Sequence, residues 1–200
     1  MSDIPKYLPL SQRPRRDESA VTANWAGHVA ALLQPLADSV EQATDEQWPE
    51  IADAANQALW LSTRSRIAGF SPRARPTLPR AEAAAGLREA ARAAAAPGAK
   101  RGIRHLAAAV VGTWDIGRTT GRAVHVDPVA SGAVALARSL AAPTPIRAVV
   151  TVRTLEAVDA DWRVGTGPTL ASTASEIVLF LYGRGGLPAE SRPDEPLAGG

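Results

Sequence analysis

The chain has 200 residues, of which 22 are basic and 20 acidic, so its net charge is only +2. This balance excludes a general electrostatic attraction to nucleic acid or to anionic membranes. The absence of cysteine excludes disulfides, thiolate nucleophiles and cysteine-bound metals. No segment reaches the roughly 18 consecutive apolar residues of a membrane span, and the start has no apolar stretch typical of a signal peptide. We therefore expect a soluble, cytoplasmic protein.

Both ends of the chain are rich in proline and charged residues. Such a composition buries little surface, so residues 1–20 are expected to form a flexible arm and residues 185–200 a disordered tail. The length in between suffices for one domain, or for one domain with a small second unit.

The first half of the chain has the apolar spacing of helices. A helix is predicted from Thr22 to about residue 43, with Pro35 inside it. Thr44 and Gln47 have the spacing of a capping box, which predicts a second helix to about Phe70. A proline-rich basic loop separates it from an alanine-rich third helix over 80–96, which Pro97 and Gly98 end.

A fourth helix is predicted from about Lys100, ending at Gly117 or Gly121. Its apolar face consists of Ile103, Leu106, Ala107, Val110, Val111 and Trp114. Asp127 and Pro128 have the chemistry of a helix start, and the fifth helix runs to Leu140. Long alanine-rich helices with short connections predict an antiparallel bundle over residues 21–143.

After Pro145 the pattern changes to β-branched and alternating residues. We predict two strands, at 146–154 and 157–164, that form a hairpin. Ser172 or Thr173 caps a final helix that ends at Gly183. The fold class expected is therefore α+β, mainly α, with a helix bundle followed by a small ββα unit over residues 144–184.

Three stretches carry a resemblance to a known family. VVGTWDIGRTTGRAVHVDP resembles the "VHGWDLARATG" signature of the mycothiol-dependent maleylpyruvate isomerase family, whose N-terminal part is a DinB-like four-helix bundle. The ending VTVRTLEAVDADWRVGTGPTLASTASEIVLFLYGR resembles that family's small C-terminal α/β domain, and DEQWPEIADAANQALWLSTRSRIAG resembles its second helix. The resemblance covers roughly residues 45–184.

The resemblance implies a divalent metal held by two histidines and an acidic residue, or by three histidines, and mycothiol as thiol cofactor. The positions that match these ligands hold Gln57, or Asn56 if the register slips, together with Ala108 and Gly112. Alanine and glycine side chains have no ligating atom, so we expect no bound divalent metal. A site rebuilt from His28, His105 and an acidic residue is a further hypothesis, although no two histidines have helical i, i+3 or i, i+4 spacing.

Asp115 is a candidate general base or orienting residue, with Arg118 one turn further on. The alternative is that Trp114 fills the core while Asp115 makes a structural hydrogen bond. The side-chain amides of Gln57 and Asn56 either bind a ligand or make their hydrogen bonds within the protein.

His105 is a candidate acid or base, or a solvated surface residue. Arg184 matches the closing Gly-Arg of the family, in which an arginine of this domain meets the substrate carboxylates; the alternative is a cation that interacts with a helix end. A basic cluster also occurs in the chain, and without interleaved aromatic residues it does not predict nucleic-acid binding. The cluster consists of Arg64, Arg66, Arg73, Arg75 and Arg80.

Two functions follow from these observations. The first is a metal-independent relative of the isomerase family that acts on a small carboxylate-bearing molecule as an isomerase, cyclase or thiol-transfer enzyme. Its pocket would lie between the bundle and the ββα unit. The second is a non-catalytic small-molecule or protein-binding scaffold with the same fold. The expected partners are a small-molecule ligand and a second copy in a homodimer, with neither nucleic acid nor membrane. The candidate catalytic residues are Asp115, His105 and Arg184, and the candidate ligand-binding residues are Gln57, Asn56, Trp114 and Arg118.

Overall fold

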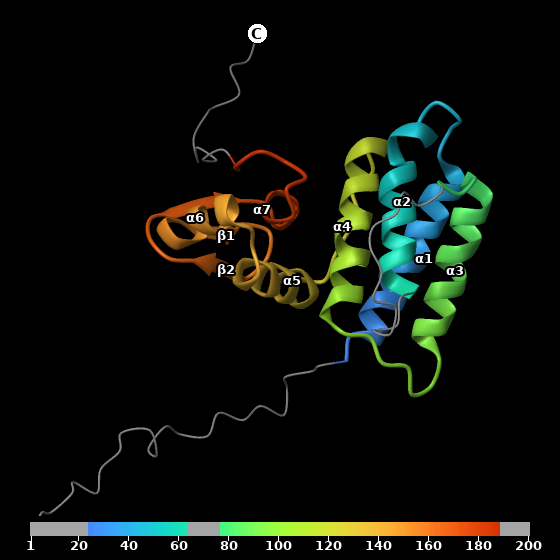
Figure 1. The fold of residues 1–200 in the computed structure, drawn as a ribbon, viewed down its shortest axis with the longest axis horizontal. Helices are drawn as coiled ribbons and strands as arrows, with labels where there is room; N and C mark the ends of the chain where they lie inside the picture. The colour runs from blue at the N-terminus through green and yellow to red at the C-terminus, as the bar shows by residue number, and fades with distance from the viewer. Residues whose placement is uncertain (1–23, 64–76, 189–200) are drawn as a thin grey trace, which may run out of the picture.

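The structure, a computed structural model, describes residues 24–63 and 77–188 (Figure 1). The expected arm, the end of the expected tail from residue 189 and the basic loop around residues 64–76 lie outside the described residues. So does the predicted end of the second helix at Phe70. The described chain is mainly helical, with a small three-stranded sheet near its C-terminal end, and so belongs to the predicted α+β class.

Four helices form a bundle, on the right of Figure 1. They are α1 (Ala26–Gln42), α2 (Trp48–Thr63), α3 (Arg80–Ala95) and α4 (Ile103–Thr120). Helix α1 packs on α3 and α4, and α2 packs on α4 and α3. The core between them is built mostly of alanine, leucine and valine side chains.

The bundle contains both antiparallel and parallel neighbours. Helix α3 begins beside the end of α1, where Arg80 Nη1 donates a hydrogen bond to the Ala43 carbonyl, so α1 and α3 are antiparallel. Helices α1 and α4 run parallel, because Trp25 N donates to Arg101 O at their beginnings and Arg122 Nη1 donates to Gln42 Oε1 at their ends. The bundle therefore differs from the all-antiparallel arrangement that short connections predicted. Helix α2 ends at Thr63 and α3 begins at Arg80, so the connection between these two helices is longer than the others in the bundle.

Local capping chemistry sets several helix ends as predicted. The Thr44 hydroxyl accepts from Gln47 N at 3.2 Å, and the Gln47 side chain accepts from Thr44 N at 3.1 Å, just before α2. The Asp127 carboxylate accepts from Val129 N at 2.7 Å at the beginning of α5. Helix α4 ends at Thr120, and Gly121 follows it with a φ of 68° that glycine readily adopts.

The C-terminal half consists of α5 (Pro128–Leu140), α6 (Thr144–Val152), β1 (Thr154–Ala157), β2 (Trp162–Gly165), β3 (Thr169–Ser172) and α7 (Ala174–Leu181). The strand order is β2-β1-β3, with β1 and β2 antiparallel and β1 and β3 parallel. Helix α5, assigned to the bundle from the sequence, packs on α7 and β2 as well as on α4. It thereby connects the two halves of the molecule.

The predicted strand at 146–154 is wrong over most of its length, because Thr144–Val152 form helix α6. Pro145 lies in the first turn of this helix, and Ile146, Val149 and Val150 have the i, i+3, i+4 spacing of its inner face. Tertiary packing of this face outweighs the strand preference of β-branched residues. The hairpin itself forms, but between β1 and β2.

Strand β3 was not predicted. It follows a turn in which Gly165 and Gly167 have positive φ, and a Cβ on either residue would overlap the backbone at the end of α6. These glycines let the chain cross closely past residues 150–153 and pair on the other side of β1. The final helix begins as predicted, with Thr173 and Glu176 in a capping box.

Within the described residues, no single helix is long and apolar enough to cross a membrane. Only α5 and α6 taken together satisfy that test of length and composition, and they are bent by 110°.

Gly112 sets the distance between α2 and α4, because a Cβ at this position would lie 2.6 Å from Ala58 Cβ. We predict that Gly112→Ala lowers the free energy of unfolding by about 1–3 kcal/mol through overpacking, despite the better helix propensity of alanine. Gly27→Ala in α1 is the matched control, because a Cβ there meets nothing within 4 Å. It should be neutral or raise stability by up to about 1 kcal/mol. Urea denaturation measures both, and equal effects of the two substitutions would contradict the close contact.

Candidate functional site

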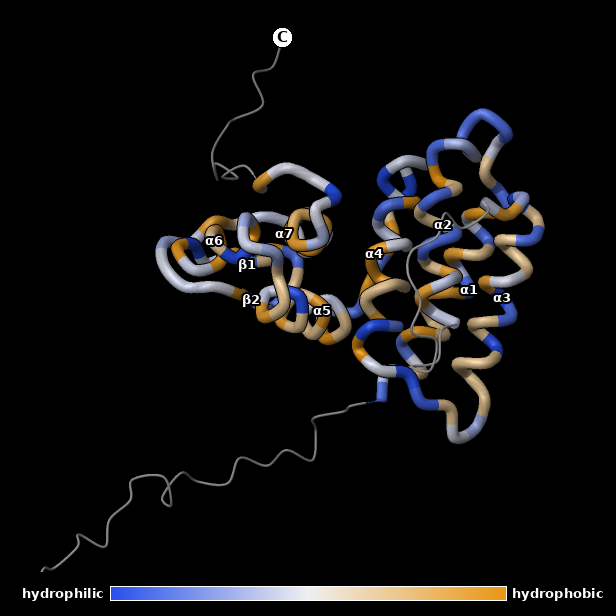
Figure 2. The backbone as a smooth tube through the Cα atoms, viewed as in Figure 1, coloured by the Kyte–Doolittle hydropathy of each residue, from blue (hydrophilic) through white to orange (hydrophobic). Residues whose placement is uncertain are grey.

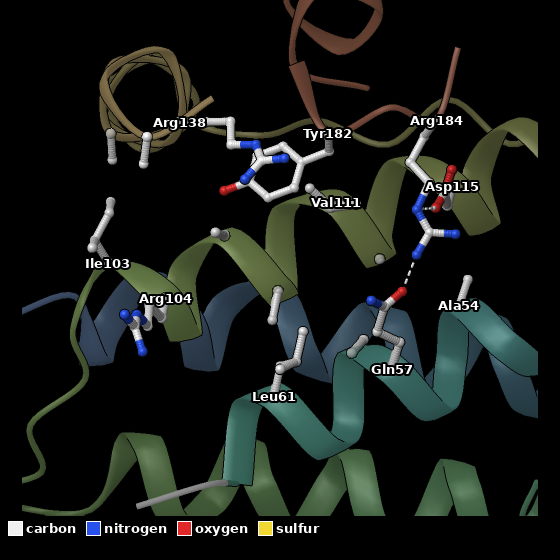
Figure 3. Close-up of a pocket in the computed structure, with 16 residues that line it drawn as sticks. Ala54, Gln57, Leu61, Ile103, Arg104, Val111, Asp115, Arg138, Tyr182 and Arg184 are labelled. Carbon is white, nitrogen blue, oxygen red and sulfur yellow. Dashed lines mark hydrogen bonds and ion pairs between the residues drawn. The ribbon is translucent and has the colours of Figure 1, made fainter. Parts of the chain in front are cut away.

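A pocket of about 580 Å³ lies between the bundle and the C-terminal half (Figure 3). Helices α2 and α4 form one side, and α5 together with the segment after α7 forms the other. Most of its wall consists of alanine, leucine, isoleucine and valine side chains. The polar residues that line it are Gln57, Arg104, Asp115, Arg138, Tyr182 and Arg184.

Asp115 is the only carboxylate among the lining residues that the structure describes. Its side chain is 8% exposed and lies between two guanidinium groups. Arg118 Nη2 is 3.2 Å from Oδ1, and Arg184 Nε is 3.6 Å from Oδ2. Burial raises the pKa of Asp115, while Arg184 and then Arg118 act in the opposite direction. The carboxyl group is thus buried, paired and shifted toward the protonated form.

The end of α7 places Arg184 over the bundle. Gly183, with φ of 70°, lies just after the helix; its N–H donates to Phe180 O, and Arg184 N donates to Leu179 O. This pair of hydrogen bonds is a Schellman motif, which turns the chain sharply at the helix end. The Arg184 side chain then reaches α2, where its Nη2 donates to Gln57 Oε1, as Figure 3 shows.

Arg118, which lies outside the pocket, adds further contacts between the bundle and the segment after α7. Its Nη1 donates a hydrogen bond of 3.0 Å to the Arg184 carbonyl, while its Nη2 pairs with Asp115. Arg118 therefore holds both the backbone and the ion-pair partner of Arg184. Together with Trp114 it lines a second pocket, of about 820 Å³, on the other side of this connection.

The structure brings Gln57, Asp115 and Arg184 together at one end of the pocket, with Arg118 behind Asp115. The other candidates lie elsewhere: Trp114 lines only the second pocket, and half-buried His105 lines neither.

Asn56 also lies outside the pocket, and its side-chain amide makes hydrogen bonds within the protein. Its amide Nδ2 donates to Ala52 O at 2.7 Å, and its Oδ1 accepts from Leu78 N at 3.1 Å. The structure therefore shows that this buried amide makes its hydrogen bonds within the protein and does not face the pocket.

Arg138 and Tyr182 were missed by the sequence analysis. The Arg138 guanidinium carbon lies 4.8 Å from the centre of the Tyr182 ring, and Arg138 Nε donates to Leu181 O at 2.9 Å. Burial raises the pKa of Tyr182, while the charge of Arg138 acts in the opposite direction. The phenol is protonated at neutral pH and can donate a hydrogen bond. One signal was available, because Arg138 is the only charged residue of α5.

The residues at the expected metal position do not fit a metal ion. Gln57, Ala108 and Gly112 all line the pocket, but Ala108 and Gly112 supply no ligand, and the Gln57 oxygen accepts from Arg184. A larger side chain at Gly112 would collide with Ala58. Nowhere in the described ranges do three or more histidine, aspartate or glutamate side chains converge to hold a metal.

Comparison of the chain with models of protein families, with curated proteins and with solved structures gives no match.

We predict that Asp115 titrates above its ordinary value of 3.8 and that Arg184→Met raises this pKa further, because a guanidinium that favours the charged form is removed. A raised carboxyl pKa means that the folded state binds more protons than the unfolded state between the two pKa values. Stability contributed by Asp115 is therefore present at low pH and is lost as the pH rises through the folded pKa. Titration of the carboxyl ¹³C shift in the wild type and the variant measures the effect. A lower midpoint in the variant would contradict the pairing.

Proposed function

We propose that the protein binds a small carboxylate-bearing molecule in this pocket and acts on it without a metal ion. The observation that carries the proposal is the charge of the lining: three guanidinium groups, those of Arg104, Arg138 and Arg184, line the cavity with a single carboxylate, and the rest of the lining is uncharged. Guanidinium binds carboxylate through paired hydrogen bonds, and apolar walls strengthen such contacts by excluding water. The lining therefore favours an anionic ligand over a cationic one.

The resemblance to the maleylpyruvate isomerase family supports this proposal. Residues 57, 108 and 112, matched to the family's metal ligands, come from two helices and lie on one pocket. Such convergence is expected if the bundle is DinB-like and the match has the correct register. We propose that this chain is a relative of the family that has lost the metal, acts in the cytoplasm and retains mycothiol as a thiol co-ligand.

Asp115 is the group that we propose to transfer a proton. Burial keeps it closer to the protonated form than an exposed aspartate, and its Oδ2 faces Arg184 at the end of the pocket. A ligand carboxylate held by Arg184 would lie beside this carboxyl group. Proton transfer within a small acid is the chemistry of an isomerase, and the same pair would serve a cyclase or a thiol transfer.

A second candidate function is non-catalytic binding. It is favoured by the two ion pairs of Asp115, which occupy this carboxylate with the structural task of holding Arg118 and Arg184. In that case the pocket binds the same class of ligand, but no proton moves.

Arg184→Met should weaken the binding of small carboxylates by about 10- to 100-fold, as expected for the loss of a charge-assisted hydrogen bond in a partly buried site. Isothermal titration against a panel of mono- and dicarboxylates, with and without a thiol, measures the affinity. Arg92→Met is the matched control, since Arg92 is an exposed arginine on α3 that pairs only with Glu89. Gln57→Leu provides a second pocket variant should Arg184→Met fold poorly. An unchanged affinity in both pocket variants would overturn the proposed binding site.

Asp115→Asn separates the two candidate functions. If Asp115 transfers a proton, the variant still binds the ligand found by titration but loses at least about 100-fold in turnover. Turnover is followed by NMR of the ligand, under conditions where both proteins are saturated. Equal spectra with and without wild-type protein would favour the non-catalytic binder.

A further inference from the structure

Helix α5 has two different sides. Towards the protein it contributes Ala137 and Arg138 to the pocket, and Ala141 just after the helix also lines it. Towards solvent it presents three large apolar side chains: Val129 is 65% exposed, Leu136 56% and Leu140 78%. Figure 2 shows the helix coloured mostly toward the hydrophobic end of the scale.

These exposed residues form a regular seam. Together with the partly buried Ala133 they follow the spacing 4, 3, 4 along α5, which places all four within an arc of about 60° at 100° per residue. This spacing is that of the core positions of a coiled coil, whose side chains pack into a facing helix. A second helix can therefore pack along this exposed seam over the whole length of α5.

The sequence of the seam is complementary to itself. In an antiparallel pair with a two-fold axis between residues 134 and 135, Val129 faces Leu140 of the partner subunit and Ala133 faces Leu136 of the partner subunit. A small side chain thus lies opposite a large one at the centre, and the two-fold symmetry repeats both contacts. Antiparallel helices also place opposite dipole ends together.

The charges around the seam fit the same partner. The single charged residue of α5, Arg138, is turned inward to Leu181 O and Tyr182, so the seam can meet its own copy without like-charge repulsion. Exposed Asp127 lies at the beginning of α5, and the nearest charge beyond its end is exposed Arg147. Antiparallel pairing places the beginning of one α5, with Asp127, against the end of the other, after which α6 with Arg147 departs at a bend of 110°.

We propose that the outward face of α5 is a homodimer interface, with the second copy of this chain packed antiparallel along Val129, Ala133, Leu136 and Leu140. The helix is about 20 Å long and about 10 Å wide, smaller than the roughly 800 Å² per partner of a standard stable interface. The dimer is consequently weak and forms at micromolar or higher concentration. This inference does not depend on the ligand of the pocket.

Sedimentation velocity of the full chain from about 5 to about 500 µM, the range of weak interfaces, tests the proposal. The wild type should change with concentration from the mass of one chain, 20.9 kDa, toward twice that mass. The double variant Leu136→Glu, Leu140→Glu places like charges in the seam and should raise the dissociation constant more than about tenfold. Both residues are exposed, so its fold should be retained, as circular dichroism checks. Val158→Glu is the matched control: Val158 is 63% exposed, on the turn after β1, and this variant should dimerise like the wild type.

Oxidative crosslinking tests the direction of the pair, because the chain has no cysteine of its own. In the antiparallel register the two copies of residue 136 are offset by about 4.5 Å along the axis, and the two copies of residue 140 by about 16.5 Å. Leu136→Cys should therefore form disulfide dimers and Leu140→Cys should not. Crosslinking of both would contradict the antiparallel register.

A wild type that stays at 20.9 kDa at every concentration, or a charged double variant that dimerises like the wild type, would overturn the interface. A monomeric wild type that floats with anionic vesicles, when the double variant does not, would show that this face binds a membrane. That result would also overturn the homodimer interface.

Discussion

The arrangement of the pocket depends on one buried carboxylate held between two guanidinium groups. Asp115 belongs to the bundle, whereas Arg184 belongs to the C-terminal half, and Arg118 contacts both. Burying a carboxylate is unfavourable unless charge and hydrogen bonds compensate it, so these three groups require one another. Their pairing fixes the position of the segment after α7. The Arg184 side chain is held further by Gln57, and the Tyr182 ring is positioned separately, by the guanidinium of Arg138.

Small residues of α2 and α4 determine the shape of the pocket wall that these two helices form. Gly112 lets the two helices approach until Ala58 fills the space where a larger residue at position 112 would project. Gly112 thus serves as a helix contact, and Ala108 beside it as apolar lining of the pocket. An alanine-rich composition, which looks uninformative in the sequence, produces both the close contact and the cavity beside it.

Much of the fold could be predicted from local chemistry, and the exceptions have tertiary causes. Thr44 with Gln47, Asp127 and Thr173 each start a helix because a side chain satisfies nearby backbone N–H groups, which neighbouring residues alone decide. Helix α6 depends on packing of its inner face, and β3 on two glycines that pass the end of α6. At the site, the sequence analysis named Gln57, Asp115 and Arg184, which meet in the pocket. It also named His105, Asn56 and Trp114, which do not line it. The pairing of Arg138 with Tyr182 requires knowing that α5 lies beside α7, which no local pattern encodes.

Helix α5 links the two proposals physically. Its inner side carries Arg138, which a ligand anion would contact, and its outer side carries the apolar seam, in which Leu136 and Leu140 are each two positions away in sequence. Because the helix is a rigid element, a displacement of its backbone on ligand binding would move Arg138, Leu136 and Leu140 together. Coupling between binding sites is reciprocal, so a ligand that strengthens pairing along α5 must itself bind more tightly to the dimer. The same helix that closes the pocket would then connect ligand occupancy to the state of assembly.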